Sequence, residues 1–171
     1  MKVKDICTRT VRSCTPETTL AYAGWAMWEN DCGALPVLDE NGSVMGVVTD
    51  RDISIGAATK YCPAAEIAVR EVIAPKVHVC KLGDDVRDAL KTMRQERVRR
   101  LPVVDPEGKL QGLLSLNDIA LAAVPDNSAT PSDVTYEDLA LAMKAVGGHR
   151  GAPKEERRSE TTTTRSMTGP R

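Results

Sequence analysis

The second half of the chain shows an ordered series of apolar patterns. Residues 76–80 alternate apolar and polar side chains, which predicts a short strand, and residues 86–97 carry apolar side chains at helical spacing, which predicts an amphipathic helix. The apolar runs 101–104 and 110–114 are joined by a turn that contains a glycine and predict a β-hairpin. Ser115 is a good N-cap for a closing helix. The predicted order is therefore strand, helix, strand, strand, helix.

The first half of the chain repeats this pattern. Residues 3–54 align with residues 69–120 at an offset of 66 residues and without a gap, so the chain contains an internal duplication. A unit of about fifty residues buries little core alone, and we expect the two units to pack face to face about a pseudo-twofold axis with two equivalent clefts. The matching positions include Val11 and Val77, Cys14 and Cys80, Ala23 and Ala89, Met27 and Met93, Leu35–Val37 and Leu101–Val103, Gly42 and Gly108, Gly46 and Gly112, and Asp52 and Asp118.

A mixed α+β (α/β) fold with five segments is predicted. A short helix at Val3–Ile6, echoed at Val69–Val72, opens each unit, and Ser132–Val146 reads as one further amphipathic helix closed by two glycines. Its apolar residues can lie on the two repeats or on a partner. The segments are repeat 1 (1–60), a connector (61–68), repeat 2 (69–124), a linker with the C-terminal helix (125–148), and a tail (149–171) whose composition is typical of disorder.

Composition and charge narrow the class of protein. Hydrophobic residues make up 42% and charged residues 27% of the 171, which is ordinary for a globular protein. Lys and Arg number 23 against 24 Asp and Glu, so no strong field attracts nucleic acid or an anionic membrane. No apolar run is long enough to span a bilayer, and we expect a cytoplasmic protein without nucleic-acid or membrane partners.

The five cysteines are interpreted as structural thiols. They are odd in number and form no CxxC pair, so a reducing compartment would keep them as small apolar residues. A redox or metal role is the alternative, with only His78 and His149 available as imidazole ligands. No metal site is predicted.

The closing turn of each repeat carries candidate binding chemistry. Thr49 and Asp52, and likewise Ser115 and Asp118, place a hydroxyl and a carboxylate on one side of the first helical turn, beside backbone N–H groups that have no helical partner. The carboxylate can accept hydrogen bonds from ribose hydroxyls, while the hydroxyl and the helix N-terminus can hold a phosphate oxygen. The alternative is that these residues only cap their helices.

The paired units resemble the tandem CBS domain, or Bateman module. The resemblance covers roughly residues 1–124 and rests on the strands Gly33–Val37 and Arg99–Val103, the hairpin glycines, and the closing motifs Gly46–Asp52 and Gly112–Asp118. Each motif is weak alone, but together, twice and at one spacing, they are specific.

The resemblance implies adenosine recognition in the clefts between the repeats. The basic pair Arg99–Arg100 of repeat 2 corresponds in the alignment to Gly33–Ala34 of repeat 1, so one cleft is expected to bind better than the other. The sequence leaves open which cleft the arginines serve. Leu116 replaces Asp50, which leaves the shape of the second closing turn open. Predicted ligand-binding residues are Thr49, Asp50, Arg51 and Asp52, Ser115, Asn117 and Asp118, Arg99 and Arg100, and the base-contacting Val11, Ala34, Pro36, Val77 and Pro102.

The function predicted from the resemblance is a non-enzymatic sensor of AMP, ADP or ATP that forms a homodimer through helical faces. S-adenosylmethionine is a weaker ligand candidate, and no cofactor is expected to be required. The alternatives are a ligand-free scaffold for an unknown protein partner and a redox-responsive module. Related modules occur within inosine monophosphate dehydrogenase, but no nucleophile–base pair or phosphate loop supports an enzyme here. Candidates for the dimer face, unless they form the core, are Ala23, Met27, Ala89 and Met93, with Trp25 and Trp28 as interface anchors or buried residues.

Overall fold

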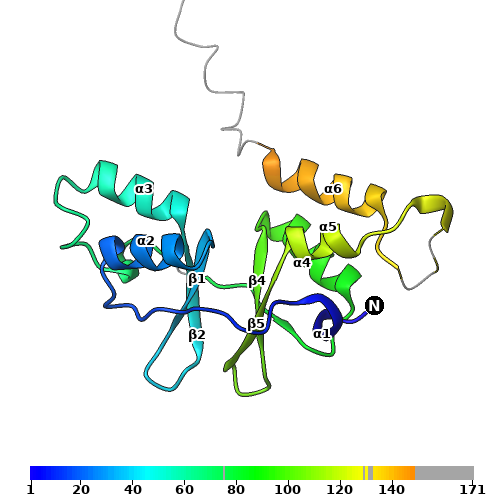
Figure 1. Cartoon of the computed structure of the whole chain (residues 1–171), viewed down its shortest axis with the longest axis horizontal. Coiled ribbons are helices and arrows are strands. Elements are labelled where there is room, and N and C mark those ends of the chain that lie inside the picture. The colour runs from blue at the N-terminus through cyan, green and yellow to red at the C-terminus, as the bar shows by residue number, and fades with distance from the viewer. Residues whose placement is uncertain (75, 129, 131–132, 149–171) are drawn as a thin grey trace, which may run out of the picture.

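A computed structural model describes residues 1–74, 76–128, 130 and 133–148 of the chain. It has two lobes side by side, one for each repeat, with a β-hairpin of each lobe at the boundary and helices above them (Figure 1). The predicted tail lies outside the described residues. The elements are α1 (Val3–Ile6), α2 (Leu20–Glu29), β1 (Ala34–Leu38), β2 (Val44–Thr49), α3 (Asp50–Thr59), the 3₁₀ turn η1 (Val69–Glu71), β3 (Cys80–Lys81), α4 (Val86–Glu96), β4 (Arg100–Val104), β5 (Leu110–Ser115), α5 (Leu116–Ala122), the 3₁₀ turn η2 (Asp126–Ser128) and α6 (Tyr136–Gly147).

The two hairpins have the same register. Ala34 pairs with Thr49 in repeat 1, Arg100 pairs with Ser115 in repeat 2, and each hairpin has its irregularity at the equivalent position. Gly42 and Gly108 adopt φ of 79° and 83° in the turns, as the sequence predicted. The hairpin tips also join the repeats, because the Val44 N–H donates to the Gly108 carbonyl at 3.1 Å. The duplication in the sequence is therefore a duplication of structure.

The predicted first strands are shorter than expected. In repeat 2 only Cys80–Lys81 forms a strand, which pairs in parallel with β4, and residues 76–79 have no strand structure. In repeat 1 only Cys14 makes a bridge, with Val37. Each of these segments pairs along one side alone, with the first strand of its hairpin, and this pairing extends over one or two residues.

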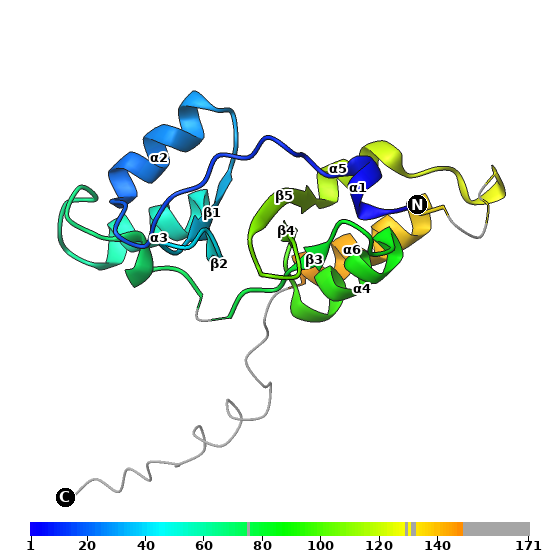
Figure 2. The ribbon, with the colours of Figure 1, turned by 90° about the horizontal axis from the view of Figure 1, so that it is seen from below.

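The opening helices exchange places between the repeats. Val3, in α1, is fully buried in the core of repeat 2, and its N–H donates to the Asp84 carbonyl at 3.0 Å. Val69, in η1, is fully buried in the core of repeat 1, and its N–H donates to the Thr18 carbonyl at 2.8 Å. Figure 2 shows α1 beside α5 and β5. Each lobe therefore contains an element from the other repeat.

Helix α6 packs on repeat 2. It begins after Thr135 instead of near Ser132, because the Thr135 hydroxyl accepts the Asp138 N–H and the Asp138 carboxylate accepts the Thr135 N–H. Ala142 is fully buried in the core of that lobe, whereas Leu141 is 42% exposed and lies on the outer face.

Two of the open alternatives for the helices are resolved. The four residues proposed as core or dimer face belong to the core: Ala23, Met27, Ala89 and Met93 are buried. In contrast, Trp25 and Trp28 lie on the surface, 54% and 83% exposed. No described helix is long and apolar enough to cross a membrane.

Candidate functional site

The closing turns of both repeats have one geometry. The Thr49 hydroxyl donates to Oδ2 of Asp52 at 2.7 Å, the Thr49 N–H donates to the same oxygen at 3.0 Å, and the Asp52 N–H donates back to the Thr49 hydroxyl. Ser115 and Asp118 repeat these bonds at 2.6, 2.7 and 3.2 Å. Backbone dihedrals at the two caps agree within 2°. The substitution of Leu116 for Asp50 therefore leaves the shape of the second turn unchanged.

Capping uses only one oxygen of each aspartate. Oδ1 of Asp52 makes no hydrogen bond to any described residue, whereas Oδ1 of Asp118 accepts the Thr8 hydroxyl at 3.4 Å. Both carboxylates are half-buried. Oδ1 can accept a hydrogen bond from a ligand hydroxyl, and it is more available in repeat 1 than in repeat 2.

A third capping box shows that this local pattern alone is not specific for a ligand. Thr135 and Asp138 form it at the start of α6, where Asp138 lies 3.7 Å from the Arg87 guanidinium and holds α6 to α4. The boxes at Thr49 and Ser115 differ because they stand at the ends of β2 and β5, in the hairpins at the boundary between the lobes.

The first strand of each hairpin presents one side to its own core and the other side to the opposite repeat. Leu35 and Leu101 are fully buried in the cores of their lobes. Their neighbours point the other way, because side chains alternate along a strand. The residues on that second side include Ala34, Pro36 and Pro102, which are all buried, and Arg100, which is half-buried. Of the predicted base-contacting residues, Val11 and Val77 are thus the more accessible.

Arg100 crosses from repeat 2 to the closing turn of repeat 1. A Cβ atom added to Gly33 would lie 3.3 Å from Nη2 of Arg100 and 3.2 Å from Oδ2 of Asp50, so the missing side chain leaves room for both groups. Burial lowers the pKa of the Arg100 guanidinium, the charge of Arg99 lowers it further, and Asp50 opposes the shift. The guanidinium remains charged at neutral pH.

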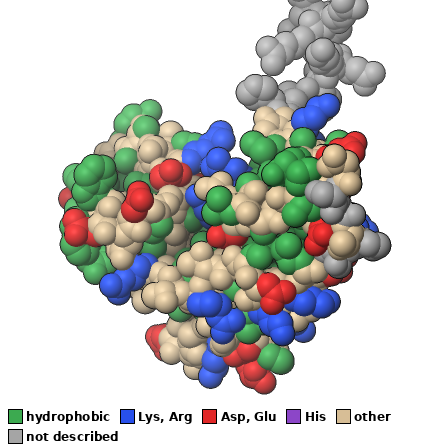
Figure 3. All heavy atoms as spheres, turned by 45° about the vertical axis from the view of Figure 1, so that its right-hand side comes forward, with side chains coloured by type: hydrophobic (Ala, Val, Ile, Leu, Met, Phe, Trp, Pro, Cys, Tyr) green, Lys and Arg blue, Asp and Glu red, His purple; other side chains and the backbone are tan. Residues whose placement is uncertain are grey.

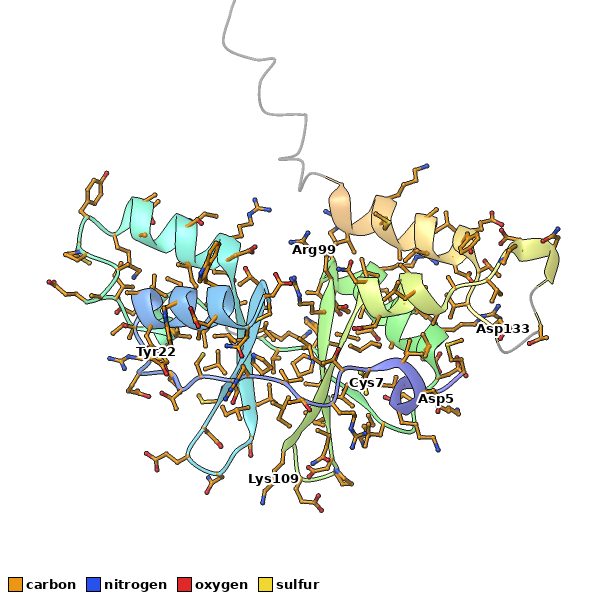
Figure 4. The ribbon with its side chains drawn as sticks, viewed as in Figure 1. Asp5, Cys7, Tyr22, Arg99, Lys109 and Asp133 are labelled. Atoms are coloured by element: carbon orange, nitrogen blue, oxygen red, sulfur yellow. The ribbon has the colours of Figure 1, made fainter. Side chains whose placement is uncertain are left out.

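The remaining predicted polar residues are exposed. Arg51, Arg99 and Asn117 extend into solvent. Arg99 lies at the upper end of β4, in the space between α3 and α6 (Figure 4). Figure 3 shows Lys and Arg side chains near the upper end of the boundary between the lobes. Arg99 and Arg100 therefore bring positive charge to this end of the boundary.

Thr8 and Gly33 take part in the site geometry without having been predicted as site residues. Thr8 reaches Asp118 because the N-terminal segment runs along β5, where Thr8 and Leu113 exchange backbone hydrogen bonds. A sequence signal for Gly33 was available, because the alignment of the repeats matches Gly33 with Arg99. No cluster of three or more His, Cys, Asp or Glu residues able to hold a metal occurs among the described residues.

Three of the five cysteines are core residues. All five cysteines are free, and Cys7, Cys14 and Cys80 are buried. Burial raises the pKa of the Cys14 thiol to about 11 and that of Cys80 to about 12, so both are protonated at neutral pH.

Comparisons with known proteins agree with the duplicated fold. The CBS domain model matches residues 3–55 and 69–124. The chain is 31% identical over 131 residues to the CBS domain-containing protein YhcV of Bacillus subtilis, covering 74% of this chain and 89% of that one. It is 31% identical over 119 residues to inosine-5'-monophosphate dehydrogenase of Methanocaldococcus jannaschii, a match that covers 69% of this chain but 23% of the enzyme.

Solved structures give the same result. A signal-transduction protein with CBS domains from Burkholderia ambifaria superposes with a TM-score of 0.66 at 28% identity, covering 77% of this chain and all of that one. CBSX2, solved in complex with AMP, superposes with a TM-score of 0.60 at 27% identity, covering 71% of this chain and 94% of that one. Sequence, fold and paired closing turns therefore agree that this chain belongs to the CBS domain family and carries two CBS domains.

Proposed function

We propose that the chain is a regulatory module without catalytic activity that binds AMP, ADP or ATP reversibly between its two CBS domains. The observation that carries this proposal is the paired hydroxyl and carboxylate at the boundary of the lobes, with one oxygen of Asp52 free and the Arg100 guanidinium near the same turn. The bound AMP in the related CBSX2 structure supports the choice of ligand class. The five cysteines form no disulfide, which suits a reducing compartment, and we assign the module to the cytoplasm.

The two clefts are not equivalent in this proposal. In repeat 1 the Asp52 carboxylate accepts the ribose hydroxyls, the Thr49 turn holds a phosphate oxygen, and Arg100 and Arg51 neutralise phosphate charge. At the closing turn of repeat 2, the position equivalent to Arg100 is Ala34 of repeat 1, and Thr8 already donates to Asp118. The cleft of repeat 1 is therefore the higher-affinity site. Val11 and Val77, one in each cleft, are the accessible apolar contacts for the base.

Calorimetric titration with adenosine, AMP, ADP and ATP tests the ligand and the site. The Asp52→Asn variant should lose about tenfold or more in affinity, because a hydrogen bond to a charged group contributes about 1.5 to 3 kcal/mol. Asp118→Asn should lose less. Asp138→Asn is the matched control, because it changes the same capping box away from the lobe boundary. Absence of both heat and thermal shift with every adenine nucleotide would refute the proposal.

We further propose that the module is a homodimer that associates through its helices. The exposed aromatic residues of α2, and not the core residues Met27 and Met93, supply the surface for this contact. Light scattering after size exclusion checks the mass, and a monomer at all concentrations would contradict this part.

A further inference from the structure

The closing turn of repeat 1 carries an acid that the turn of repeat 2 lacks. Asp50 is exposed, its N–H donates to the Gly33 carbonyl at 3.4 Å, and its Oδ1 accepts the Arg51 N–H at 2.7 Å. In repeat 2 the equivalent residue, Leu116, donates its N–H to the Arg99 carbonyl at 3.0 Å. The backbone contact is the same in both repeats, so the turn does not need a carboxylate at this position to form.

Asp50 reduces the positive charge that Arg100 brings to this turn. Oδ2 of Asp50 and Nη2 of Arg100 lie 3.2 and 3.3 Å from the position of a Cβ at Gly33, so the two atoms are at most about 6.5 Å apart. Burial and Arg99 lower the pKa of Arg100 and Asp50 raises it, as expected for opposite charges at this range. A phosphate that approaches the guanidinium is therefore also repelled by the carboxylate.

The space next to the turn holds a second carboxylate. A hollow of about 380 Å³ extends from Asp50 and Gly33 to the C-terminal end of α2, where Trp28 and Asp31 form part of its wall. Neither Lys nor Arg is among the described residues that line it. A phosphate chain that extends into this hollow would pass two carboxylates and meet no cation in the lining.

From this arrangement we infer that Asp50 is a specificity residue, which makes the cleft of repeat 1 select AMP over ADP and ATP. The inference rests on the nucleotide site of the proposed function. One phosphate group at the Thr49 turn gains the attraction of Arg100. Each further phosphate group adds negative charge that Asp50 and Asp31 repel, and a like charge placed against the competing ligand is a general means of discrimination.

A carboxylate near phosphates can also have the opposite effect. Mg²⁺ is commonly held by one or two carboxylates together with the phosphates of a nucleotide, and Asp50 in that role would favour ATP. In the described part of the chain, no group of three or more candidate metal-binding side chains includes Asp50. The two roles predict opposite effects of removing its charge, which makes them separable by one substitution.

Removal of the Asp50 charge tests the inference. Asp50→Asn keeps the size of the side chain, and Asp50→Leu introduces the residue that repeat 2 carries in a turn of the same shape. Calorimetric titration of the full chain with adenosine, AMP and ATP, at low salt with EDTA and again with Mg²⁺, measures the affinities. The original chain should bind AMP about tenfold more tightly than ATP, and both variants should reduce this ratio to about threefold or less. The gain in affinity should be largest for ATP, smaller for AMP and smallest for adenosine.

Glu40→Gln is the matched control for this substitution. It removes one exposed carboxylate at the tip of the same hairpin, at the end of the lobe away from α3 (Figure 1). The ratio of AMP to ATP affinity should therefore stay as in the original chain. An original chain that binds ATP as tightly as AMP, or variants that keep the original ratio, would overturn the inference. Weaker ATP binding by Asp50→Asn in the presence of Mg²⁺ would also overturn it, because the carboxylate would then serve the metal.

Failure of this inference is distinguishable from failure of the proposed function. If no adenine nucleotide gives heat or a thermal shift with any of these chains, the nucleotide site itself is wrong. If AMP and ATP both bind and their ratio does not respond to Asp50, the nucleotide site stands and only the specificity role is lost. Circular dichroism of each variant checks that the chain is folded.

Discussion

The two repeats share a backbone but differ in what covers it. Their hairpins have equal register and their caps equal dihedrals, yet repeat 2 is covered by α6 as well as by α1, while the helices of repeat 1 are bare enough to expose Trp28. The site residues differ as well, since Asp50 and Gly33 in repeat 1 correspond to Leu116 and Arg99 in repeat 2. Duplication thus preserved the main-chain framework, while the two surfaces came to carry different chemistry.

Substitution of two equivalent leucines tests whether the additional helices packed on repeat 2 limit its relaxation around a cavity. Leu35→Ala and Leu101→Ala each remove a fully buried side chain and should lower the free energy of unfolding by about 2 to 5 kcal/mol. The loss should be larger for Leu101→Ala, because α1 and α6 restrain the lobe around the cavity that this substitution leaves. Urea denaturation followed by circular dichroism measures both. A larger loss for Leu35→Ala would contradict the comparison.

Thiol labelling separates the repeats by accessibility. The two half-buried cysteines, Cys32 and Cys62, both belong to the lobe of repeat 1. At pH 8 a disulfide reagent should modify these two first and react at least about a hundredfold more slowly with Cys14 and Cys80, because burial raises their pKa and lowers the thiolate fraction. Mass spectrometry of digested protein identifies the sites. Early modification of Cys80 would show that repeat 2 opens more readily than expected for a lobe covered by α1 and α6.

Equivalent glycines distinguish how closely the exchanged segments approach each hairpin. A Cβ at Gly112 would lie 2.7 Å from the carbonyl oxygen of Thr8, and one at Gly46 would lie 3.1 Å from Cδ1 of Ile73. Gly112→Ala should cost about 1 to 3 kcal/mol because backbone must move, and Gly46→Ala less than about 1 kcal/mol because a side-chain end can rotate. Thermal unfolding measures both. Equal costs would mean that the N-terminal segment moves as easily as a side chain.

The smallest expected difference is at Thr8. Its hydroxyl donates an exposed hydrogen bond to Asp118, which has no equivalent in the lobe of repeat 1 because Ala74 occupies the position that matches Thr8. Thr8→Val should destabilise the chain by about 0.5 kcal/mol or less. Thr10→Val, at an exposed residue without a hydrogen bond to the described residues, is the control. If Thr8→Val destabilised the chain by about 1 kcal/mol more than the control, Thr8 would have a role in stability that has no counterpart in repeat 1.

Local sequence signals predicted the local structure well. The hairpin glycines, the caps at Thr49 and Ser115, and the end of α4 near Arg97 all occur as predicted, because each depends on a few neighbouring residues. The later start of α6 was also encoded locally, in the Thr135–Asp138 pattern that matches the other two boxes.

Contacts between distant segments could not be predicted. The exchange of α1 and η1 requires knowing which core Val3 enters, and both cores accept a valine. The exposed face of α2 could not be predicted either, because apolar residues occur all around the helix and their spacing does not mark one buried side. The position of Arg100 beside Asp50 depends on the packing of one repeat against the other.

The exchange of opening helices has a consequence for the history of the chain. A solitary unit of this kind would lack the segment that fills its own core and would have to borrow it from a second molecule, as domain-swapped proteins do. Cutting the chain between residues 55 and 69 would accordingly leave two incomplete halves, each missing a valine of its interior. A single-copy unit of this architecture would be complete only as an intertwined pair, and the covalent link between the two repeats makes that partnership permanent.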